Sequence, residues 1–90
     1  MNKAKWIQKA LNELAVIWTN ADPETRKKIN EATKTIDKEL GENPRHKGES
    51  RPDDTRILIE RPLGVLFRVA EKGHAVVRHV WFIHPHKKKT

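Results

Sequence analysis

The sequence predicts a single α+β domain, with two helices in its first half and an antiparallel sheet in its second. In residues 3–40 apolar side chains recur every three or four positions, which is the period of an amphipathic helix. In residues 56–83 they alternate at every second position between turn-forming residues, which is typical of strands. Ninety residues suffice for one domain and leave no room for a second.

The first helix is expected to run from Lys3 to about Asn20. Its apolar stripe consists of Ile7, Ala10, Leu11, Leu14, Ile17 and Trp18. A short leading strand around Lys5–Ile7 has little support in the sequence. The stripe predicts that one side of this helix packs on the rest of the domain.

The second helix is expected from Pro23 to about Leu40. Asp22 is a favourable N-cap because its carboxylate accepts an otherwise unpaired backbone N–H, and Pro23 suits the first turn. The buried stripe is predicted to be Ile29, Ala32, Ile36 and Leu40. Gly41 stands where a left-handed C-terminal cap is expected. The short break between the helices predicts an antiparallel helical hairpin over residues 3–40.

Residues 42–55 form a polar loop rich in turn formers, which is long for so small a domain. A β-meander is expected over 56–83, with strands at 56–60, 63–69 and 75–83 and tight turns between them. The helical hairpin must bury its apolar stripe against one face of this small twisted sheet. Residues 84–90 form a basic tail.

The two-residue period of a strand predicts which side chains face the helices. The inward set is expected to be Ile57, Ile59, Val65, Phe67 and Val69. Arg56, Glu60 and Arg68 then share the opposite face. The last strand leaves two alternatives open, of which the first would place Arg78 beside these arginines. The two alternative inward sets are Val77, Trp81 and Ile83, or Val76, Val80 and Phe82.

Positive charge is concentrated in the second half of the chain. The 19 Lys and Arg exceed the 12 Asp and Glu by 7. Residues 1–40 hold 8 basic and 6 acidic side chains, a balance of +2, whereas residues 41–90 hold 11 and 6, a balance of +5. Such a surface favours a polyanionic partner, most commonly nucleic acid. A generic basic protein, or one with an acidic protein partner, is the alternative.

Several functional classes are disfavoured by composition. The chain has no cysteine, which excludes thiolate metal sites and thiol catalysis. No apolar stretch is long enough to span a membrane and no signal peptide is recognisable, so a cytoplasmic protein is expected. The sequence offers no glycine-rich phosphate loop, and His84 and His86 lack a third metal ligand nearby. No metal or other cofactor is expected.

His79, His84 and His86 lie near the end of the last strand. A histidine beside arginines is suited to general acid–base catalysis of phosphodiester cleavage, because its pKa lies near working pH. A bland tail residue is the alternative for His84. Trp6, Trp18 and Trp81 are expected to be anchors of the core or its edge rather than base-stacking platforms.

The order of these elements and several short strings resemble the RelE/ParE superfamily of bacterial type II toxin–antitoxin toxins, over nearly the whole chain. The resemblance rests on the order and spacing of the strings together. The strings are Ala10–Trp18, Ile36–Leu40, Asn43–Pro44, Gly48–Arg51, Arg56–Ile59, Pro62–Val69 and Val77–Trp81.

The resemblance implies a helical hairpin on a twisted antiparallel sheet and a cognate antitoxin that wraps and neutralises the toxin. RelE-like members cut mRNA in the ribosomal A site, and ParE-like members poison DNA gyrase. Carried over by position, the resemblance implies Arg56, Arg78 and His84 as catalytic residues. The basic surface adds nucleic-acid-binding candidates, which are Arg51, Arg61, Arg68, Lys87 and Lys88.

The chain departs from the RelE-like pattern at one position and in one residue type. Gly64 stands where RelE-like enzymes place a second-strand arginine, and the chain has no tyrosine. Losing such an arginine typically costs about 2–4 kcal/mol of transition-state stabilisation. Arg61 or Arg68 is the candidate to compensate. An mRNA endonuclease is therefore the first hypothesis, and a ParE-like gyrase inhibitor or a noncatalytic binding relic are the alternatives.

Overall fold

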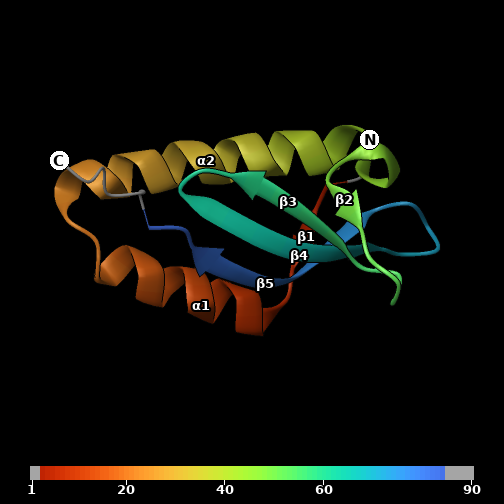
Figure 1. Cartoon of the computed structure of the whole chain (residues 1–90), viewed down its shortest axis with the longest axis horizontal. Coiled ribbons are helices and arrows are strands. Elements are labelled where there is room, and N and C mark those ends of the chain that lie inside the picture. The colour runs from red at the N-terminus through yellow and green to blue at the C-terminus, as the bar shows by residue number, and fades with distance from the viewer. Residues whose placement is uncertain (1–2, 85–90) are drawn as a thin grey trace, which may run out of the picture.

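The computed structural model describes residues 3–84 and contains two helices and a five-stranded sheet (Figure 1). The predicted α+β class is confirmed. No helix in the part of the chain described is long and apolar enough to cross a membrane. The elements are β1 (Lys5–Trp6), α1 (Gln8–Thr19), α2 (Pro23–Glu42), a 3-10 turn (Pro44–His46), β2 (Glu49–Ser50), β3 (Arg56–Glu60), β4 (Leu63–Val69) and β5 (Ala75–Phe82).

The strands are ordered β1-β5-β4-β3-β2 across the sheet. β3, β4 and β5 form the predicted antiparallel meander, and β3 and β4 have the expected bounds. β1 pairs with β5 in parallel, with Lys5 opposite Val76, so the sheet is mixed and the prediction of a wholly antiparallel sheet was wrong. Two residues are too few to show an alternating pattern, which explains the weak signal for β1 in the sequence.

The helix α1 begins at Gln8 rather than at Lys3, because Lys5 and Trp6 belong to β1. It lies along β5. Of its predicted apolar stripe only Ala10 is fully buried, whereas Leu11 and Trp18 are exposed. The stripe is therefore wider than the surface that α1 buries.

The helix α2 starts as predicted and ends later. Asp22 Oδ1 accepts a hydrogen bond from Thr25 N at 2.8 Å, so the predicted N-cap is confirmed. The helix continues through Gly41 to Glu42, and the prediction that Gly41 caps it was wrong. It ends there because the next residue, Asn43, precedes Pro44, and a residue before proline is forced out of the helical conformation.

Arg26 joins the end of α1 to the beginning of α2. Its guanidinium donates to the carbonyl oxygens of Trp18 at 2.9 Å and Thr19 at 3.0 Å, and it stacks 4.2 Å from the Trp18 ring centroid. A cation at a helix C-terminus satisfies free carbonyls and favours the helix dipole. Each helix packs mainly on the sheet, α1 on β5 and α2 on β3 and β4, so a helix–helix hairpin stays a prediction.

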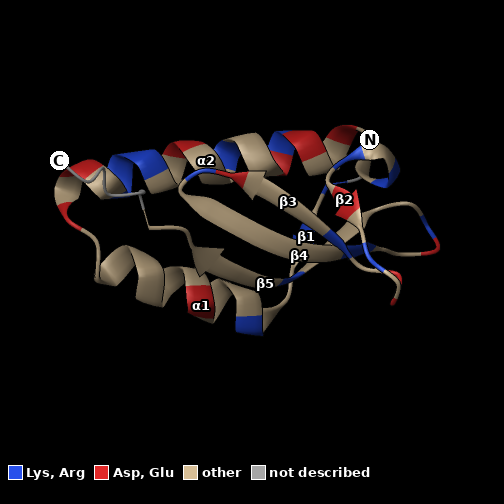
Figure 2. Ribbon diagram, in the orientation of Figure 1, with Lys and Arg blue, Asp and Glu red and all other residues tan. Residues whose placement is uncertain are grey.

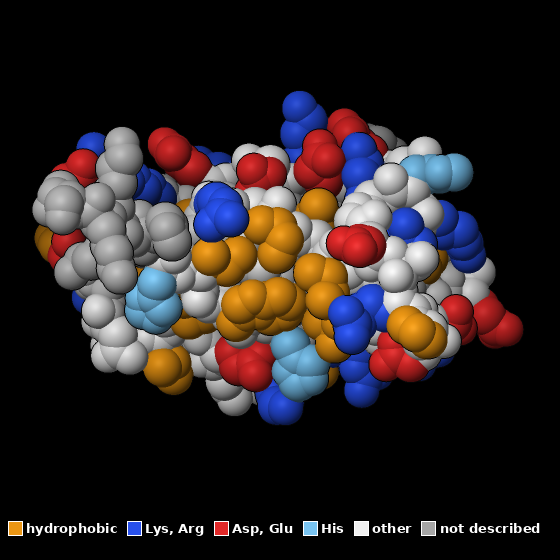
Figure 3. Space-filling model, viewed as in Figure 1, with side chains coloured by type: hydrophobic (Ala, Val, Ile, Leu, Met, Phe, Trp, Pro, Cys, Tyr) orange, Lys and Arg blue, Asp and Glu red, His pale blue; other side chains and the backbone are white. Residues whose placement is uncertain are grey.

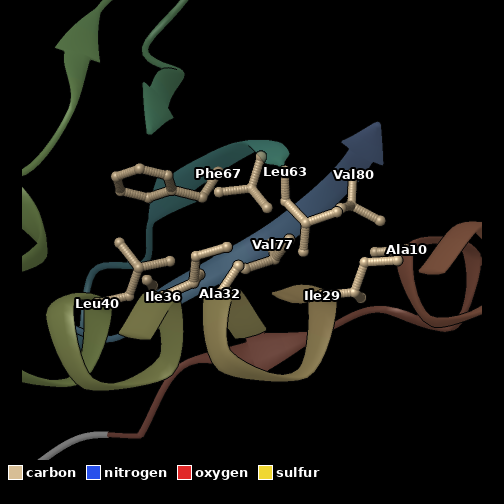
Figure 4. Packing of buried hydrophobic residues seen from close by; sticks show 11 residues of the cluster. Ala10, Ile29, Ala32, Ile36, Leu40, Leu63, Phe67, Val77 and Val80 are labelled. Carbon is tan, nitrogen blue, oxygen red and sulfur yellow. The ribbon is translucent and has the colours of Figure 1, made fainter. Parts of the chain in front are cut away.

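The core lies between α2, α1 and one face of the sheet (Figure 4). The predicted stripe of α2 is confirmed, since Ile29, Ala32, Ile36 and Leu40 are all buried. They meet Leu63, Phe67, Val77 and Val80 from β4 and β5, and Ala10 from α1. Each fully buried large aliphatic or aromatic side chain contributes about 1.5–3 kcal/mol, so this single layer of contacts is the main source of stability.

The phase of β3 is opposite to the one predicted. In the register of β3 with β4, Leu58 lies opposite the buried Val65, so Leu58 faces the helices. Ile59 lies opposite Gly64 and is 46% exposed. The placement of Ile57 and Ile59 on the helix side was therefore wrong. Three consecutive apolar residues at 57–59 carry no clear alternation, and the larger set was not the buried one.

The same register places Arg56 and Glu60 on the helix side of the sheet, opposite Phe67 and Leu63. Their predicted position on the other face was wrong. We call that other face, which no helix covers, the open face. It bears Ile57, Ile59, Gly64, Leu66, Arg68, Val76, Arg78, His79 and Trp81.

A β-bulge in β5 explains why the last strand gave two equally good patterns. Phe67 pairs with Val77 and the preceding Leu66 pairs with His79, which leaves Arg78 as an extra residue on β5. Val77 and Val80 are both buried although they are three positions apart. Each predicted inward set is therefore right for one part of the strand only, because the bulge shifts the phase between them.

Candidate functional site

The open face combines an apolar centre with polar and charged side chains around it (Figure 3). Ile59 and Trp81, which are 46% and 36% exposed, lie on this same face, and exposed apolar residues that form one patch mark interaction sites. Arg68 and Arg78 are exposed on the same face. Such a surface is suited to contact with a partner that has both apolar or aromatic groups and negative charge.

The bulge in β5 places two consecutive polar side chains on this face. Val77 and Val80 point into the core, so neither Arg78 nor His79, which lie between them, points there. In a regular strand one of the two would have faced the helices. Bulges occur beside active sites because they redirect a side chain in this way. The arginine and the histidine are thereby brought side by side.

Glu13 of α1 contacts β5 at His79 and Val80, at the edge of the open face. Its Oε1 accepts a hydrogen bond from Val80 N at 3.0 Å, and its Oε2 lies 3.4 Å from His79 Nδ1. The carboxylate therefore satisfies a backbone N–H at a point where β5 has no neighbouring strand. Both side chains stay accessible, His79 at 38% and Glu13 at 32%.

The same contacts set the ionisation of Glu13. Partial burial alone would raise the pKa of this carboxyl, but the Val80 N–H, the His79 side chain and Lys9 hold the pKa below its usual value. The Glu13 carboxyl is therefore ionised at neutral pH. A carboxylate at Nδ1 favours the tautomer in which Nδ1 carries the hydrogen, which leaves His79 Nε2 as a base.

Arg56, which the sequence predicted as catalytic, holds a loop in place through hydrogen bonds to backbone carbonyls. Its Nε donates to the carbonyl oxygen of Lys47 at 2.7 Å, and a terminal nitrogen donates to that of Gly48 at 3.3 Å. It therefore anchors the loop before β2 on the helix side of the sheet. Arg56 and Arg78 lie on opposite faces, so the structure does not bring them together.

The remaining predicted residues fall into separate places. Arg51 and Arg56 line a groove with Arg45 at the end of the sheet next to β2, where basic residues gather in Figure 2. Arg61 lies in the turn between β3 and β4, and Arg68 lies near the other end of β4. Lys87 and Lys88 lie outside the described residues.

His84 lies past the end of β5. Its ring makes an edge contact with Phe82, with 4.8 Å between the ring centroids. It lines a hollow with Val16, Asn20 and Asp22 at the junction of the helices. Of the predicted residues, Arg68 and Arg78 therefore share the open face, and Arg51 and Arg56 share the groove next to β2. His84 belongs to neither pair.

Glu13 is the site residue that the sequence did not reveal. It is 66 positions from His79, and nothing in a helical pattern distinguishes it from a solvent-exposed acid. His79 was among the candidate acid–base residues, but its neighbours depended on the phase of β5. Only the bulge, which has no sequence signature here, decides that phase.

No protein-family model matches this chain, and no curated protein sequence is significantly similar to it.

Proposed function

We propose that this chain is the toxin of a bacterial type II toxin–antitoxin pair and inhibits growth by cutting mRNA at the ribosome. The observation that carries this proposal is the bulge in β5, which sets Arg78 and His79 side by side on the open face. The fold class, the order of elements and the net charge of +7 support it. Action in the cytoplasm, without a cofactor, is part of the proposal.

The proposed chemistry is attack by an RNA 2′-hydroxyl on the adjacent phosphorus. His79 Nε2 accepts the proton of the 2′-hydroxyl, the bond from O2′ to phosphorus forms and the bond from phosphorus to O5′ breaks. The leaving O5′ takes a proton from water, and His79 returns its own proton to solvent. The products are a 2′,3′-cyclic phosphate and a 5′-hydroxyl, and Glu13 holds the imidazole in the required tautomer.

Arg78 and Arg68 supply positive charge for the phosphate in this scheme. Removing one such group typically costs about 2–4 kcal/mol of transition-state stabilisation. Trp81 lies on the same face, two positions from His79, and presents an aromatic surface for a base. These assignments replace Arg56 and His84 in the catalytic role.

The test is induced expression without a partner, followed by primer extension on translated transcripts. We expect growth arrest and cuts inside translated codons. His79→Ala and Arg78→Ala should abolish the cuts, whereas His46→Ala and Lys34→Ala, both at exposed positions elsewhere, should keep them. Cuts that persist unchanged in both of the first two variants would exclude the proposed site.

Gyrase inhibition is the second candidate, and one observation favours it. The centre of the open face is apolar, since Trp81 covers Gly64 where RelE-like enzymes are expected to hold an arginine. An apolar centre with a charged rim is the usual anatomy of a protein interface. Intact transcripts together with gyrase-linked DNA breaks would establish this candidate, and normal growth at high expression would favour a noncatalytic relic.

A cognate antitoxin belongs to either form of the proposal. The exposed Ile59 and Trp81 would be covered by such a partner, and acidic residues on it would complement the basic excess. A small acidic open reading frame immediately beside the gene would support the pair. Its product should form a stable complex with this chain and restore growth when the two are expressed together.

A further inference from the structure

A groove at the end of the sheet next to β2 has no place in the function proposed above. It has a volume of about 290 Å³ and is lined by three arginines, Arg45, Arg51 and Arg56. One acidic side chain, Asp54, lines it as well, so its charged residues balance to +2 (three positive, one negative). Ser50 and Thr55 complete a predominantly polar wall.

Arg56 is fixed in this groove before any ligand arrives. Its guanidinium is held by the carbonyl oxygens of Lys47 and Gly48, at 2.7 and 3.3 Å, and the side chain is half-buried. The two carbonyls use two of its five N–H donors. A preorganised, partly desolvated guanidinium binds an oxyanion at a lower entropic cost than a free surface side chain does.

The loop that carries the other two arginines is tied down at several points. Gly48 has a positive φ of 71°, and a Cβ there would collide with the carbonyl oxygen of Ile57. The ends of the turn are joined by a hydrogen bond from Arg51 N to the Thr55 carbonyl oxygen at 2.8 Å. Lys47 also makes an ion pair with Glu39 of α2 at 3.2 Å. Arg45 and Arg51 are therefore presented from a defined backbone.

Nearby acids do not all compete for these arginines. Asp53 Oδ1 accepts a hydrogen bond from Thr55 Oγ1 at 2.6 Å. This hydrogen bond is the main reason that the pKa of Asp53 lies below its usual value. Asp53 does not line the groove, whereas Asp54 does. Asp54 is thus the acidic side chain among the described residues that opposes an anion there.

We propose that this arginine groove is a phosphate-binding site, separate from the open face. Its arginines present N–H donors with the fork geometry that matches phosphate oxygens. The groove is near the small end of ligand-pocket volumes, roughly 300–1,000 Å³, so it holds one phosphate with its sugar rather than an extended ligand. The phosphate belongs either to a polynucleotide backbone or to a free anion, and the experiment separates the two.

The test compares two double variants that remove the same charge. Arg45→Ala/Arg51→Ala alters the groove, and Lys27→Ala/Lys34→Ala alters exposed positions on α2. Binding of a fluorescent ten-residue oligouridine is measured by anisotropy at several salt concentrations. We expect the groove variant to bind about tenfold more weakly and to lower the salt slope by about 1.4 units, at 0.7 per phosphate contact on a single strand, and the control to change far less.

A second pair tests the groove by gain of affinity. Asp54→Asn removes the opposing charge, and asparagine tolerates the φ of 73° found at this position. Glu71→Gln removes one charge from the exposed turn between β4 and β5 and is the control. Asp54→Asn should strengthen binding several-fold, and Glu71→Gln should strengthen it less.

Titration of ¹⁵N-labelled protein with inorganic phosphate identifies the source of the ligand. Shifts confined to residues 45–56, and absent from the groove variant, would identify a free phosphate anion as sufficient. Oligouridine binding that the groove variant weakens more than the control does, without such shifts, would identify the polynucleotide backbone, and both results support the site. Equal losses in the two double variants, with no phosphate-induced shifts in that segment, would overturn it.

Phosphate binding in the groove does not depend on RNA cleavage at the open face. The groove variants leave Arg78 and His79 unaltered, and His79→Ala leaves the groove unaltered. Groove-dependent phosphate binding by a chain that arrests no growth and cuts no transcripts would refute the proposed function alone. Loss of cleavage in His79→Ala with no groove-dependent binding would refute the groove alone.

Discussion

The indole of Trp81 lies directly on the backbone of Gly64 across the β4–β5 pair. The two residues are opposite each other in the register, and a Cβ at position 64 would lie 2.5 Å from Trp81 Cε2. Glycine is required here by the close approach of the ring, and the φ of Gly64 is not in the left-handed region. The absence of an arginine at this position is thus coupled to the presence of the tryptophan two positions after His79.

This contact predicts a strong coupling between the two positions. Gly64→Ala should destabilise the protein by about 1–3 kcal/mol, as overpacking usually does, because the indole must leave its place. In a Trp81→Ala background the same change should be close to neutral or stabilising, since the space is then empty and glycine weakens a strand. Urea denaturation of the two single variants and the double variant measures the coupling. Additive effects would contradict the contact.

Glu13 is predicted to stabilise the attachment of α1 to β5. Glu13→Ala should cost about 1 kcal/mol, because Val80 N loses its acceptor at a half-buried position. Glu13→Gln keeps a side-chain oxygen for this bond and should cost less. Glu71→Ala, at an exposed position in the turn between β4 and β5, serves as the control for loss of charge. Equal stability of Glu13→Ala and wild type in urea would show that the bond contributes nothing.

The lowered pKa of Glu13 gives the stability a defined dependence on pH. Because the carboxyl has a lower pKa in the folded protein than its ordinary 4.5, the unfolded chain binds its proton first as the pH falls. The stabilisation is complete above about pH 4.5 and is lost as the pH falls through the folded pKa. Asp22 and Asp53 also have lowered pKa values, so they contribute in acid as well. The difference in unfolding free energy between wild type and Glu13→Gln should therefore shrink below pH 4.5, and a constant difference would contradict it.

The sequence predicted those parts of the fold where a local pattern of residues is compatible with only one secondary structure. The α2 stripe and the Asp22 cap were correct, because four apolar positions at helical spacing and a cap-proline pair agree with each other. The strands β3 and β4 were located correctly for the same reason. The phase of β3 was wrong because residues 57–59 are all apolar, and only pairing with Val65 shows that Leu58 is the buried one.

The candidate site was less predictable, because it depends on tertiary register. Arg78 and His79 share a face only through the extra residue in β5, and Glu13 reaches them only because α1 lies along that strand. Arg56 looked like a functional residue by type and position. Its side chain is held by two backbone carbonyls that belong to a loop eight and nine positions earlier in the chain, so it lies in the arginine groove and not on the open face.

The opposite placement of Arg56 and Arg78 yields the last prediction. Arg56→Ala removes charged hydrogen bonds to two loop carbonyls and should reduce the unfolding free energy by about 2 kcal/mol. Arg78→Ala removes an exposed side chain and should change stability by no more than about 0.5 kcal/mol. Urea denaturation of both variants gives these values.

Growth arrest on induction should rank the same two variants in the reverse order. Arg78→Ala should lose toxicity at wild-type levels of folded protein, because Arg78 lies beside His79 on the open face. Arg56→Ala should lose toxicity only in proportion to the folded protein it fails to maintain, and a lower temperature should restore it. Arg56→Lys separates the two effects further, since lysine keeps the charge but lacks the fork that reaches both carbonyls. If Arg56→Ala is nontoxic while fully folded, and Arg78→Ala stays toxic, then the helix side of the sheet carries the activity and the open face does not.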